Sequence, residues 1–472
     1  MPHDTRDERA APGTLTPELD PHLPVLLLRT DHNPLHHGTL AAIRSLGRAG
    51  VPVHAMLEGR TTPAASSRYL LHRHPWGPPP HERAELQEHL RGVAARIGRP
   101  ALLVPMDDAG AIFVAESADT LADWFVFPWQ EPALPRRAAD KSMLLAECRR
   151  QGIACPESRI PGSAAEVDAA VSGLGLPLIA KWARPWRLPP GRRSTMVIGD
   201  AAEVHRLFAE SGGAAGPLIL QRRIESERCD WFFQGYFDQE LTCLYGGTGR
   251  KYLSYPAQAG HTVLGEWTFT PELEQLARKV VRMLGVRGVV DLDFGFDADT
   301  GTFHLLDFNP RLGAQFRLFT DGQGLDLVRV AHLEQSGRPV PPIQPGYGRS
   351  LLVENHYVQR ALRRPALRRA PRPTTRPEPR PAGGPAGPPP DGPAQRAGRR
   401  RRWSPRAAEL TWYAADDLAP CLAIGRQLLL RVAGTLRRGP MRPHRDAPHR
   451  DTPHRDARLA TGRRFRRQAR GS

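Results

Sequence analysis

The sequence predicts an α/β protein in which a small parallel-sheet domain precedes a larger α+β region and a basic C-terminal tail. Strand-like and helix-like segments alternate over residues 22–130, which favours parallel βαβ units. Residues 131–340 read as hairpins and helices. The remainder divides by composition into a Pro/Arg-rich linker at 341–406, a helical segment at 407–438 and a tail at 439–472.

The positive charge of the chain is concentrated at one end. The net charge is +17, but residues 361–472 contain 27 Arg, no Lys and eight acidic residues, a net of +19 that leaves −2 for the first 360 residues. Segments such as RPAGGPAGPPPDGP, residues 380–393, cannot bury enough apolar surface to offset the entropy of ordering. We therefore predict a mostly disordered basic tail.

The cysteines and the apolar segments indicate the compartment. The five cysteines show no spacing typical of a metal site, and an odd number of them fits reduced thiols. The first residues, MPHDTRDERAAPG, lack the basic start and apolar stretch of a signal peptide. No apolar run approaches the length that spans a bilayer, so we expect a soluble, cytoplasmic protein.

In the first domain, apolar runs and helical periodicity alternate. Expected strands are PVLLLR (24–29), VPVHAML (51–57) and ALLVP (101–105), with helices over TLAAIRSLGRAG (39–50) and after the acidic loop at Asp107 and Asp108. The segment FVFPW ends this region near residue 129.

The second region has a different order of elements. One helix is expected over AADKSMLLAECRRQG, from residue 138, and a second over PELEQLARKVVRMLGV, from 271. The expected strands are LPLIAKW, LILQRRI, the aromatic hairpin DWFFQGYFD with ELTCLYGG, and the hairpin VVDLDFGFDADTGTFHLLDF at 289–308. After residue 340 we expect little regular structure before one or two helices at about 407–438.

The hairpin at 289–309 places metal-binding side chains together. Residues two apart in a strand share a face, so Asp307 and Asn309 point the same way, and Asp293 on the partner strand lies beside them. Two carboxylates and an amide oxygen suit Mg²⁺, and Arg311 could hold a phosphoryl group or an oxyanion. The alternative is that these residues make only turn and surface contacts.

Lysine is rare in this chain. Only four residues are lysine, namely Lys141, Lys181, Lys251 and Lys279, whereas 62 are arginine. In so strong a bias, the retained lysines mark positions where a compact ammonium group matters, unless they are chance survivors. Lys279 lies in a predicted helix without an assignable role.

Together these segments resemble the ATP-grasp superfamily. The resemblance rests on DKSMLLAECRRQGIACP, LPLIAKW, LILQRRI, the hairpin through DFNPR and the preceding βαβ region, and it covers roughly residues 22–338. GRKYLSYPAQAGHT and SSRYL further suggest the carboxylate-amine ligase-like branch, similar to D-aspartate ligases. It implies a small Rossmann-like pre-ATP-grasp domain before a two-lobed ATP-grasp domain.

The resemblance implies a role for each matching residue. Lys141 and Lys181 would contact the α- and β-phosphates of ATP, and Gln221, Arg222 and Ile224 would lie at the hinge beside adenine. Asp293, Asp307 and Asn309 match the Mg²⁺ ligands, and Arg311 matches the arginine that steadies an acyl phosphate and a tetrahedral intermediate. Lys251 is expected at the γ-phosphate or the acceptor substrate.

Three departures from the family pattern concern the phosphate loop, the hinge and the metal site. The loop after Lys181 contains only Gly191, with Arg184, Arg187, Arg192 and Arg193 in place of glycines. Gln221 and Asp307 each stand where glutamate is frequent. Metal binding tolerates Asp307 in place of glutamate.

The sequence gives little information on the substrates. The loops with His32, His36 and His37 could contact a substrate, although plain loop histidines are the more common case. The implied partners are a small carboxylate and a small amine, and the oligomeric state stays open.

The implied function is an ATP-dependent carboxylate-amine ligase that uses Mg-ATP and forms an amide through an acyl phosphate. Alternatives are a nucleotide-binding relative without ligase activity, or a protein whose basic tail binds nucleic acid or an anionic surface. Nucleic acid is disfavoured because the tail has few aromatic residues for base stacking. The helical segment could dock on a membrane surface, but we favour packing of its Leu face on the folded body, and the PHRD repeats near the C-terminus could bind metal weakly.

Overall fold

The computed structural model describes residues 17–224, 230–256, 260–363 and 408–437. It forms two compact units, Met1–Arg426 and Gln427–Ser472, and the sheets described below belong to the first. The PHRD repeats, residues 364–406 of the predicted linker and the whole of the predicted tail lie outside the described residues. Within the described part, no helix has the length and apolar character required to cross a membrane.

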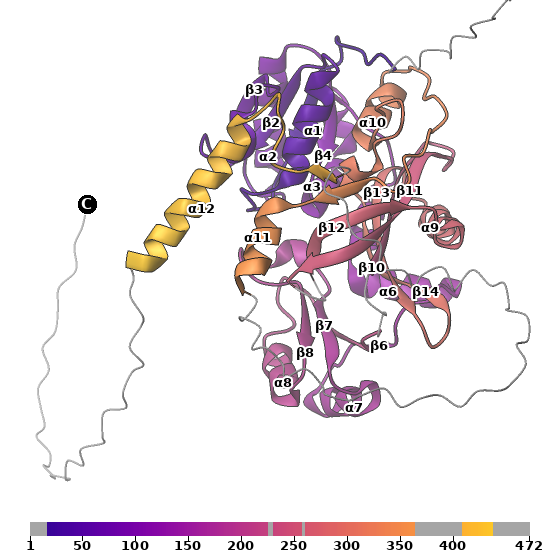
Figure 1. Cartoon of the computed structure of the whole chain (residues 1–472). Helices are drawn as coiled ribbons and strands as arrows, with labels where there is room; N and C mark the ends of the chain where they lie inside the picture. The colour runs from indigo at the N-terminus through magenta and orange to yellow at the C-terminus, as the bar shows by residue number, and fades with distance from the viewer. Residues whose placement is uncertain (1–16, 225–229, 257–259, 364–407, 438–472) are drawn as a thin grey trace, which may run out of the picture. The chain divides into compact units, whose positions relative to one another are not determined.

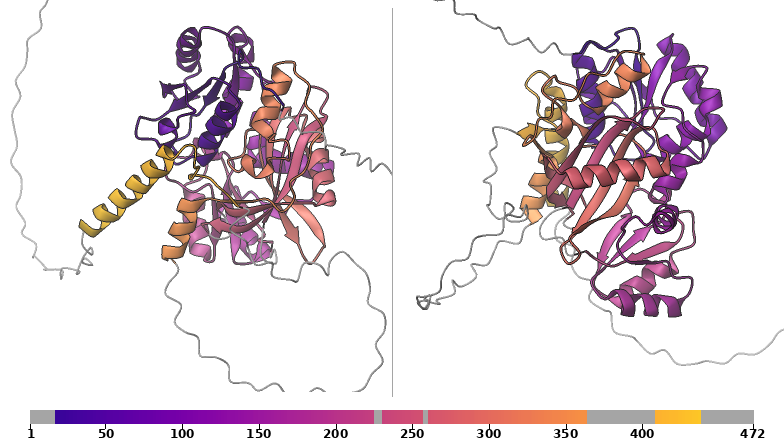
Figure 2. Two further views of the ribbon diagram at one scale, coloured as in Figure 1. Left: turned by 45° about the horizontal axis from the view of Figure 1, so that its top comes forward. Right: turned by 90° about the vertical axis from the view of Figure 1, so that its right-hand side faces the viewer.

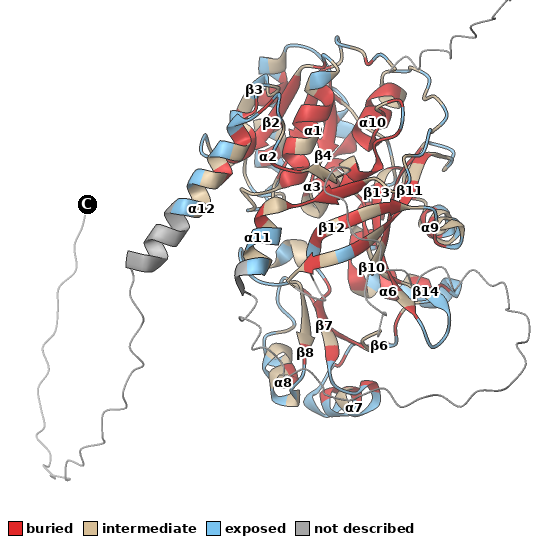
Figure 3. Cartoon of the chain, in the orientation of Figure 1, coloured by how far each residue is buried: buried red, intermediate tan, exposed pale blue. Residues whose placement is uncertain are grey.

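The N-terminal sheet is parallel throughout, as the βαβ pattern predicts. Its strand order is β3-β2-β1-β4-β5, and α1, α2 and α3 follow β1, β3 and β4 along the chain (Figure 1). All four residues of β1 and all five of β2 are buried (Figure 3). The elements are β1 Val25–Leu28, α1 His37–Arg48, β2 Val53–Leu57, η1 Pro63–Ser66, β3 His72–Pro75, α2 Arg83–Ile97, β4 Ala101–Pro105, α3 Asp108–Glu116, α4 Ala118–Leu121 and β5 Phe125–Val126.

A second, antiparallel sheet has the strand order β6-β9-β7-β8. Apolar residues of α7 and α8, including Val167 and Val204, form one core with Leu178, Ala180 and Leu220 of the strands. The elements leading to and forming this sheet are α5 Leu134–Ala139, α6 Lys141–Gln151, β6 Ser158–Arg159, α7 Ala164–Leu174, β7 Leu178–Trp182, η2 Pro185–Arg187, β8 Thr195–Ile198, α8 Ala201–Ala209 and β9 Leu218–Gln221.

The third sheet has seven strands in the order β14-β13-β10-β11-β12-β15-β16. Helix α9 lies across one face (Figure 2) and buries Leu273, Ala277, Val280 and Val281, a helical stripe with spacings of four, three and one. Its elements are β10 Asp230–Phe237, β11 Cys243–Tyr255, β12 His261–Thr268, α9 Pro271–Leu284, β13 Gly288–Asp297, β14 Thr302–Asn309, η3 Phe316–Phe319 and α10 Leu327–Gln335.

The prediction of little regular structure after residue 340 is wrong. Strand β15 (Ser350–Leu352) pairs with β12, α11 (Glu354–Arg363) follows, and β16 (Ala408–Leu410) pairs in parallel with β15. The predicted helical segment therefore begins as a strand, and α12 (Ala419–Arg437) starts only at residue 419. Three-residue strands are too short to show a period in the sequence.

The leucines of the predicted packing face, at positions 428–430 and 436, belong to the second unit, so their packing on the folded body stays a prediction. In the first unit, the start of α12 buries Pro420 and Ile424, whereas Leu422 is 72% exposed.

A buried ion pair holds the segment after β16 against the N-terminal domain. The guanidinium of Arg44, on α1, lies 2.9 Å from Asp417 (Nε to Oδ2) and donates to the carbonyls of Thr411 and Trp412. Asp417 also accepts from the hydroxyl of Ser67. The side chains of Arg44 and Asp417 are only 5% and 1% exposed, so each needs the other's charge.

We expect Asp417→Ala to lower the free energy of unfolding by about 3–5 kcal/mol, because it leaves the Arg44 guanidinium buried without a counter-charge. The neighbouring Asp416 pairs with Arg48 at the surface, with side chains 44% and 29% exposed. The control Asp416→Ala should therefore cost no more than about 1 kcal/mol. Urea unfolding measures both, and equal losses would contradict this account of the segment.

Candidate functional site

The hairpin β13–β14 brings the predicted metal ligands together. Asp293 and Asp307 are paired directly across the two strands, and Asp291 is paired with Asn309. The register shifts between Phe294, opposite Leu305, and Asp293, opposite Asp307, so Leu306 is an extra residue in β14. Such a β-bulge re-aims neighbouring side chains and frees backbone groups. The Asn309 amide nitrogen donates to the Asp291 carbonyl, 3.1 Å away, which leaves its oxygen to act as a ligand.

Lys141 forms an ion pair with Asp307 from the start of α6. The expected single helix is two helices, because Asp140 ends α5 and caps α6 by accepting from the backbone of Ser142 and Met143. The cap fixes the first residue of α6, Lys141, whose side chain is 7% exposed. Burial alone would raise the pKa of Asp307, but the charges of Lys141 and Lys181 hold it below its usual value.

Lys181 reaches the same hairpin from β7. Its ammonium donates to the carbonyl of the bulged residue Leu306 at 3.0 Å. Burial and the charge of Lys141 together lower the pKa of Lys181 to about 8, although Asp307 opposes this shift. Because its hydrogen bond is to a neutral carbonyl, Lys181 carries a charge that an anionic ligand would stabilise.

Lys251, on β11, lies 2.5 Å from Asp293 (Nζ to Oδ1) and is 8% exposed. Burial alone would lower its pKa, but Asp293 and Asp230 outweigh burial and raise it. Asp230 is the residue opposite Lys251 in the β10–β11 pairing. Lys251 therefore stays charged.

Arg311 connects the hairpin to the N-terminal domain. Its guanidinium lies 2.9 Å from Asp291 (Nη1 to Oδ2) and 3.4 Å from Asp108 (Nε to Oδ1), the first residue of α3. Burial raises the pKa of Asp291 to about 6 and also raises the pKa of Asp108, although Arg311 opposes both shifts. Gln234 donates to Asp291 at 3.0 Å and fixes its orientation.

The loop after β1 lies on the same side. His36 caps α1 through Thr39, and burial together with Arg29 and Arg311 holds its pKa well below the usual value. Burial and the neighbouring His36 likewise hold the pKa of His37 well below its usual value. His32 instead packs edge-on against Trp76, with ring centroids 4.3 Å apart. Of the three predicted loop histidines, His36 is thus the one near Arg29 and Arg311, whereas His37 has other histidines as neighbours.

Comparison with known proteins identifies this arrangement. No known protein-family profile matches the chain. Over 214 residues it is 25% identical to the carbamoyl phosphate synthase large chain of Clavibacter michiganensis subsp. michiganensis, which covers 41% of this chain and 18% of that protein. The chain thus spans about a fifth of the length of the curated relatives that it matches.

Solved structures share the fold at low sequence identity. An L-amino acid ligase from Bacillus licheniformis superposes with a TM-score of 0.53 and 12% identity over 70% of this chain and 78% of that one. The biotin carboxylase domain of 2-oxoglutarate carboxylase from Hydrogenobacter thermophilus, in complex with MgADP, ADP and bicarbonate, gives a TM-score of 0.50 and 16% identity over 69% and 72%. The chain has the ATP-grasp fold.

In this chain with the ATP-grasp fold, the predicted hinge residues lie at the end of β9, where Gln221 is the last strand residue and Arg222 and Ile224 follow. Gln221 is buried and donates to the Ser158 hydroxyl at 2.9 Å, while Arg222 pairs with Asp297 of β13 at 3.0 Å. Ile224 comes within 3.5 Å of the position that a Cβ on Gly295 would occupy. Arg222 and Ile224 of the predicted hinge therefore contact the same hairpin as the lysines.

The arginines of the predicted phosphate loop do not act as one group. Arg184 pairs with the capping residue Asp140 at 2.9 Å, and Arg192 pairs with Glu210 and lies over the Trp182 ring. Arg187 lies in the short helix η2. Lys279 lies on the exposed face of α9, away from the residues that this helix buries.

Sequence reasoning missed two acidic residues of this candidate site. It left Asp291 out, although Asp291 lies two residues before Asp293 in the same strand, and it did not connect Asp108 with Arg311. The spacing of two could have indicated Asp291, whereas the contact of Asp108 spans about 200 residues of sequence and has no local signal.

The lowered pKa of Lys181 predicts a pH dependence of stability. Between about pH 8 and 10.5 the unfolded chain binds this proton more tightly than the folded one, so the contribution of Lys181 to the free energy of unfolding rises with pH in that window. Below pH 8 the full cost of the buried charge is present.

The free energy of unfolding of Lys181→Met should therefore exceed that of the wild type most at pH 7. This difference should shrink by about 2–3 kcal/mol by pH 10. Urea unfolding across this range measures it. The exposed Lys279→Met is the control and should show no such change. A pH-independent difference for Lys181→Met would contradict the lowered pKa.

Proposed function

We propose that this chain is an ATP-dependent ligase that joins a small carboxylate to a small amine, with an acyl phosphate as intermediate. The observation that carries the proposal is the convergence of Lys141, Lys181 and Lys251, from three different elements, on the hairpin that bears the facing carboxylates Asp293 and Asp307. The L-amino acid ligase and the MgADP-bound carboxylase domain with the same fold support it.

The donor set fits Mg²⁺. Two carboxylates directly opposite one another and an amide oxygen are hard oxygen ligands, and they leave coordination positions for water and phosphate. Asp293, Asp307 and Asn309 would hold the ion, which would supply charge neutralisation on the phosphates. Within the described residues, no group of three or more His, Cys, Asp or Glu could hold a metal ion alone.

The basic residues would bind and orient the anions. We assign Lys141 and Lys181 to the α- and β-phosphates, and Lys251 to the γ-phosphate or the acceptor. Lysine suits phosphate as a compact point charge. The reaction brings a carboxylate up to a triphosphate, so positioning and cationic charge are the main contributions that side chains can make.

Arg311 would act at the reacting carbonyl. Asp291 and Asp108 hold its guanidinium at the junction with the N-terminal domain, where the loops after β1 and β4 meet. A planar guanidinium can donate two parallel hydrogen bonds to a carboxylate or to a developing oxyanion. Gln221, Arg222 and Ile224 would line the adenine site.

We extend the domain assignment accordingly. Residues 22–130 would form the pre-ATP-grasp domain, and the ATP-grasp domain would begin at 131 but run beyond 340 to include β15 and β16, because both strands belong to its larger sheet.

Binding of Mg-ATP is the first test of this proposal. A ligand selective for the folded state at about 100 times its Kd stabilises that state by about 2.7 kcal/mol, so the melting temperature should rise. Asp307→Ala combined with Asn309→Ala should abolish the magnesium-dependent rise, while the control Asp299→Ala, in the turn of the same hairpin, should keep it. No rise in a folded wild type would overturn the proposal.

A substitution at Arg311 tests nucleotide binding and the chemical reaction separately. We expect Arg311→Lys to keep the magnesium-dependent rise in melting temperature but to lower ADP release by about a hundredfold, because the ammonium group cannot replace the planar fork at the reacting carbonyl. ADP release is measured with pairs drawn from the common L-amino acids and their D-isomers. Undiminished turnover in Arg311→Lys would remove Arg311 from the mechanism.

A further inference from the structure

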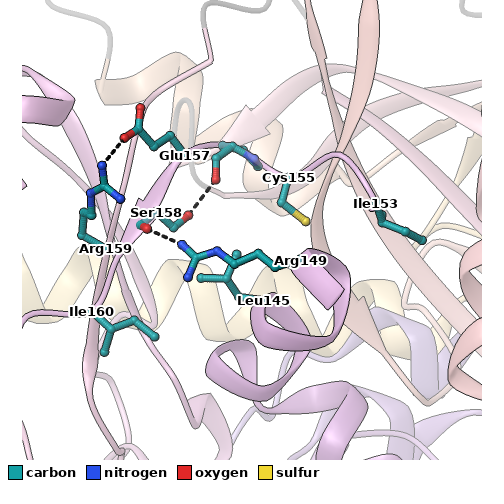
Figure 4. Close-up of a pocket in the computed structure, with 9 residues that line it drawn as sticks. Leu145, Arg149, Ile153, Cys155, Glu157, Ser158, Arg159 and Ile160 are labelled. Carbon is teal, nitrogen blue, oxygen red and sulfur yellow. Dashed lines mark hydrogen bonds and ion pairs between the residues drawn. The ribbon is translucent and has the colours of Figure 1, made fainter. Parts of the chain in front are cut away.

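A cavity of about 470 Å³ lies between the end of α6 and the chain that enters β6 (Figure 4). Arg149, Ile153, Cys155, Ser158 and Ile160 are among the residues that line it, and none of the residues assigned to nucleotide or metal does. Cys155 is the cavity's only thiol among the described residues. This thiol is partly exposed, so a small solute in the cavity can reach it.

A second thiol lies directly behind the first. Cys148, in the last turn of α6, is fully buried. Gly152 ends the helix with a φ of +66°, a conformation that suits glycine, and Ile153 then donates to the Cys148 carbonyl at 2.9 Å. This tight reversal brings Cys155 against the core cluster that contains Cys148, and the two thiols are near enough to affect each other's ionisation.

The surroundings favour a thiolate at Cys155. The neighbouring Cys148 thiol lowers the pKa of Cys155, and the charges of Lys181 and Arg149 act in the same direction, although burial opposes them. The neighbouring Cys155 and burial raise the pKa of Cys148. Burial raises the pKa of Cys243 to about 11, so the described cysteines differ strongly in reactivity.

We propose that Cys155 is an oxidant-reactive thiol and that Cys148 is its resolving partner, with a hydroperoxide as the oxidant that enters through this cavity. The Cys155 sulfur attacks the peroxide oxygen, the O–O bond breaks, and one water leaves as the sulfenic acid forms. The Cys148 sulfur then displaces the hydroxyl as a second water. Two thiols lose two electrons and two protons, and hydrogen peroxide is reduced to two waters.

The modification lies next to the lysine cluster. Ala154, adjacent to Cys155, accepts a backbone hydrogen bond from Leu305, the residue before the bulge whose carbonyl binds Lys181. The negative charge of Cys155 also favours the protonated form of Lys181. Disulfide formation removes that charge and fixes the turn. The thiol chemistry itself does not depend on the proposed ligase function.

Peptide mapping tests the disulfide directly. Trypsin cleaves after Lys141, Arg149, Arg150 and Arg159, so the two cysteines fall in separate peptides, 142–149 and 151–159. The full chain is treated with hydrogen peroxide, blocked with iodoacetamide and digested. We expect these two peptides to be joined, with the loss of two hydrogens, and we expect Cys243→Ala to give the same product.

Two further measurements separate the roles of the thiols. In Cys148→Ala, oxidation of Cys155 should stop at a sulfenic acid that dimedone traps. In the wild type, iodoacetamide should alkylate Cys155 roughly tenfold or more faster than Cys243. Equal alkylation rates, or no joined peptide from the folded chain when the urea-unfolded chain does form disulfides, would overturn the proposal.

Discussion

The ion pair between Lys141 and Asp307 is the interaction on which the site depends. It joins the first residue of α6 to the hairpin of the largest sheet, and both side chains lie where water is largely excluded. Removing one partner of such a pair leaves an uncompensated buried charge and costs about 3–5 kcal/mol. The Asp140 cap, the bulge at Leu306 and the register of β13 on β14 all fix the two atoms that must meet.

The other charges follow from this pair. Two facing carboxylates would repel each other, and the structure compensates them with Lys251 on Asp293 and Lys141 on Asp307. Lys181 instead donates to a neutral carbonyl, and its lowered pKa records the cost of that position. Lys181 is thus a weakly compensated cation beside two lysine–aspartate pairs. Such a site favours an anionic ligand, accompanied by a cation at the carboxylates, over a neutral ligand.

Much of this arrangement was readable in the sequence, and the rest depended on contacts between distant segments. The strands of β13–β14 and the turn between them follow from alternation and the DADTG signal, and the scarcity of lysine pointed to Lys141, Lys181 and Lys251. The bulge at Leu306 has no local signal, because it arises from pairing. Strands β15 and β16 are defined by their sheet neighbours, and about 55 residues separate them in the chain.

The N-terminal domain completes the site because of its strand order. Since β1 lies between β2 and β4, the loops after β1 and β4 stand where the strand order reverses, at the carboxyl ends of the strands, and α/β sheets commonly bind ligands at such a point. Asp107 bridges these loops by accepting from Thr30, and the next residue, Asp108, meets Arg311. Burial raises the pKa of Asp108 and lowers the pKa of His36, so an unpaired charge of either sign is disfavoured beside these loops. A charged ligand bound beside these loops would therefore need groups that pair with these residues, so the N-terminal domain would restrict which ligands can meet the hairpin β13–β14.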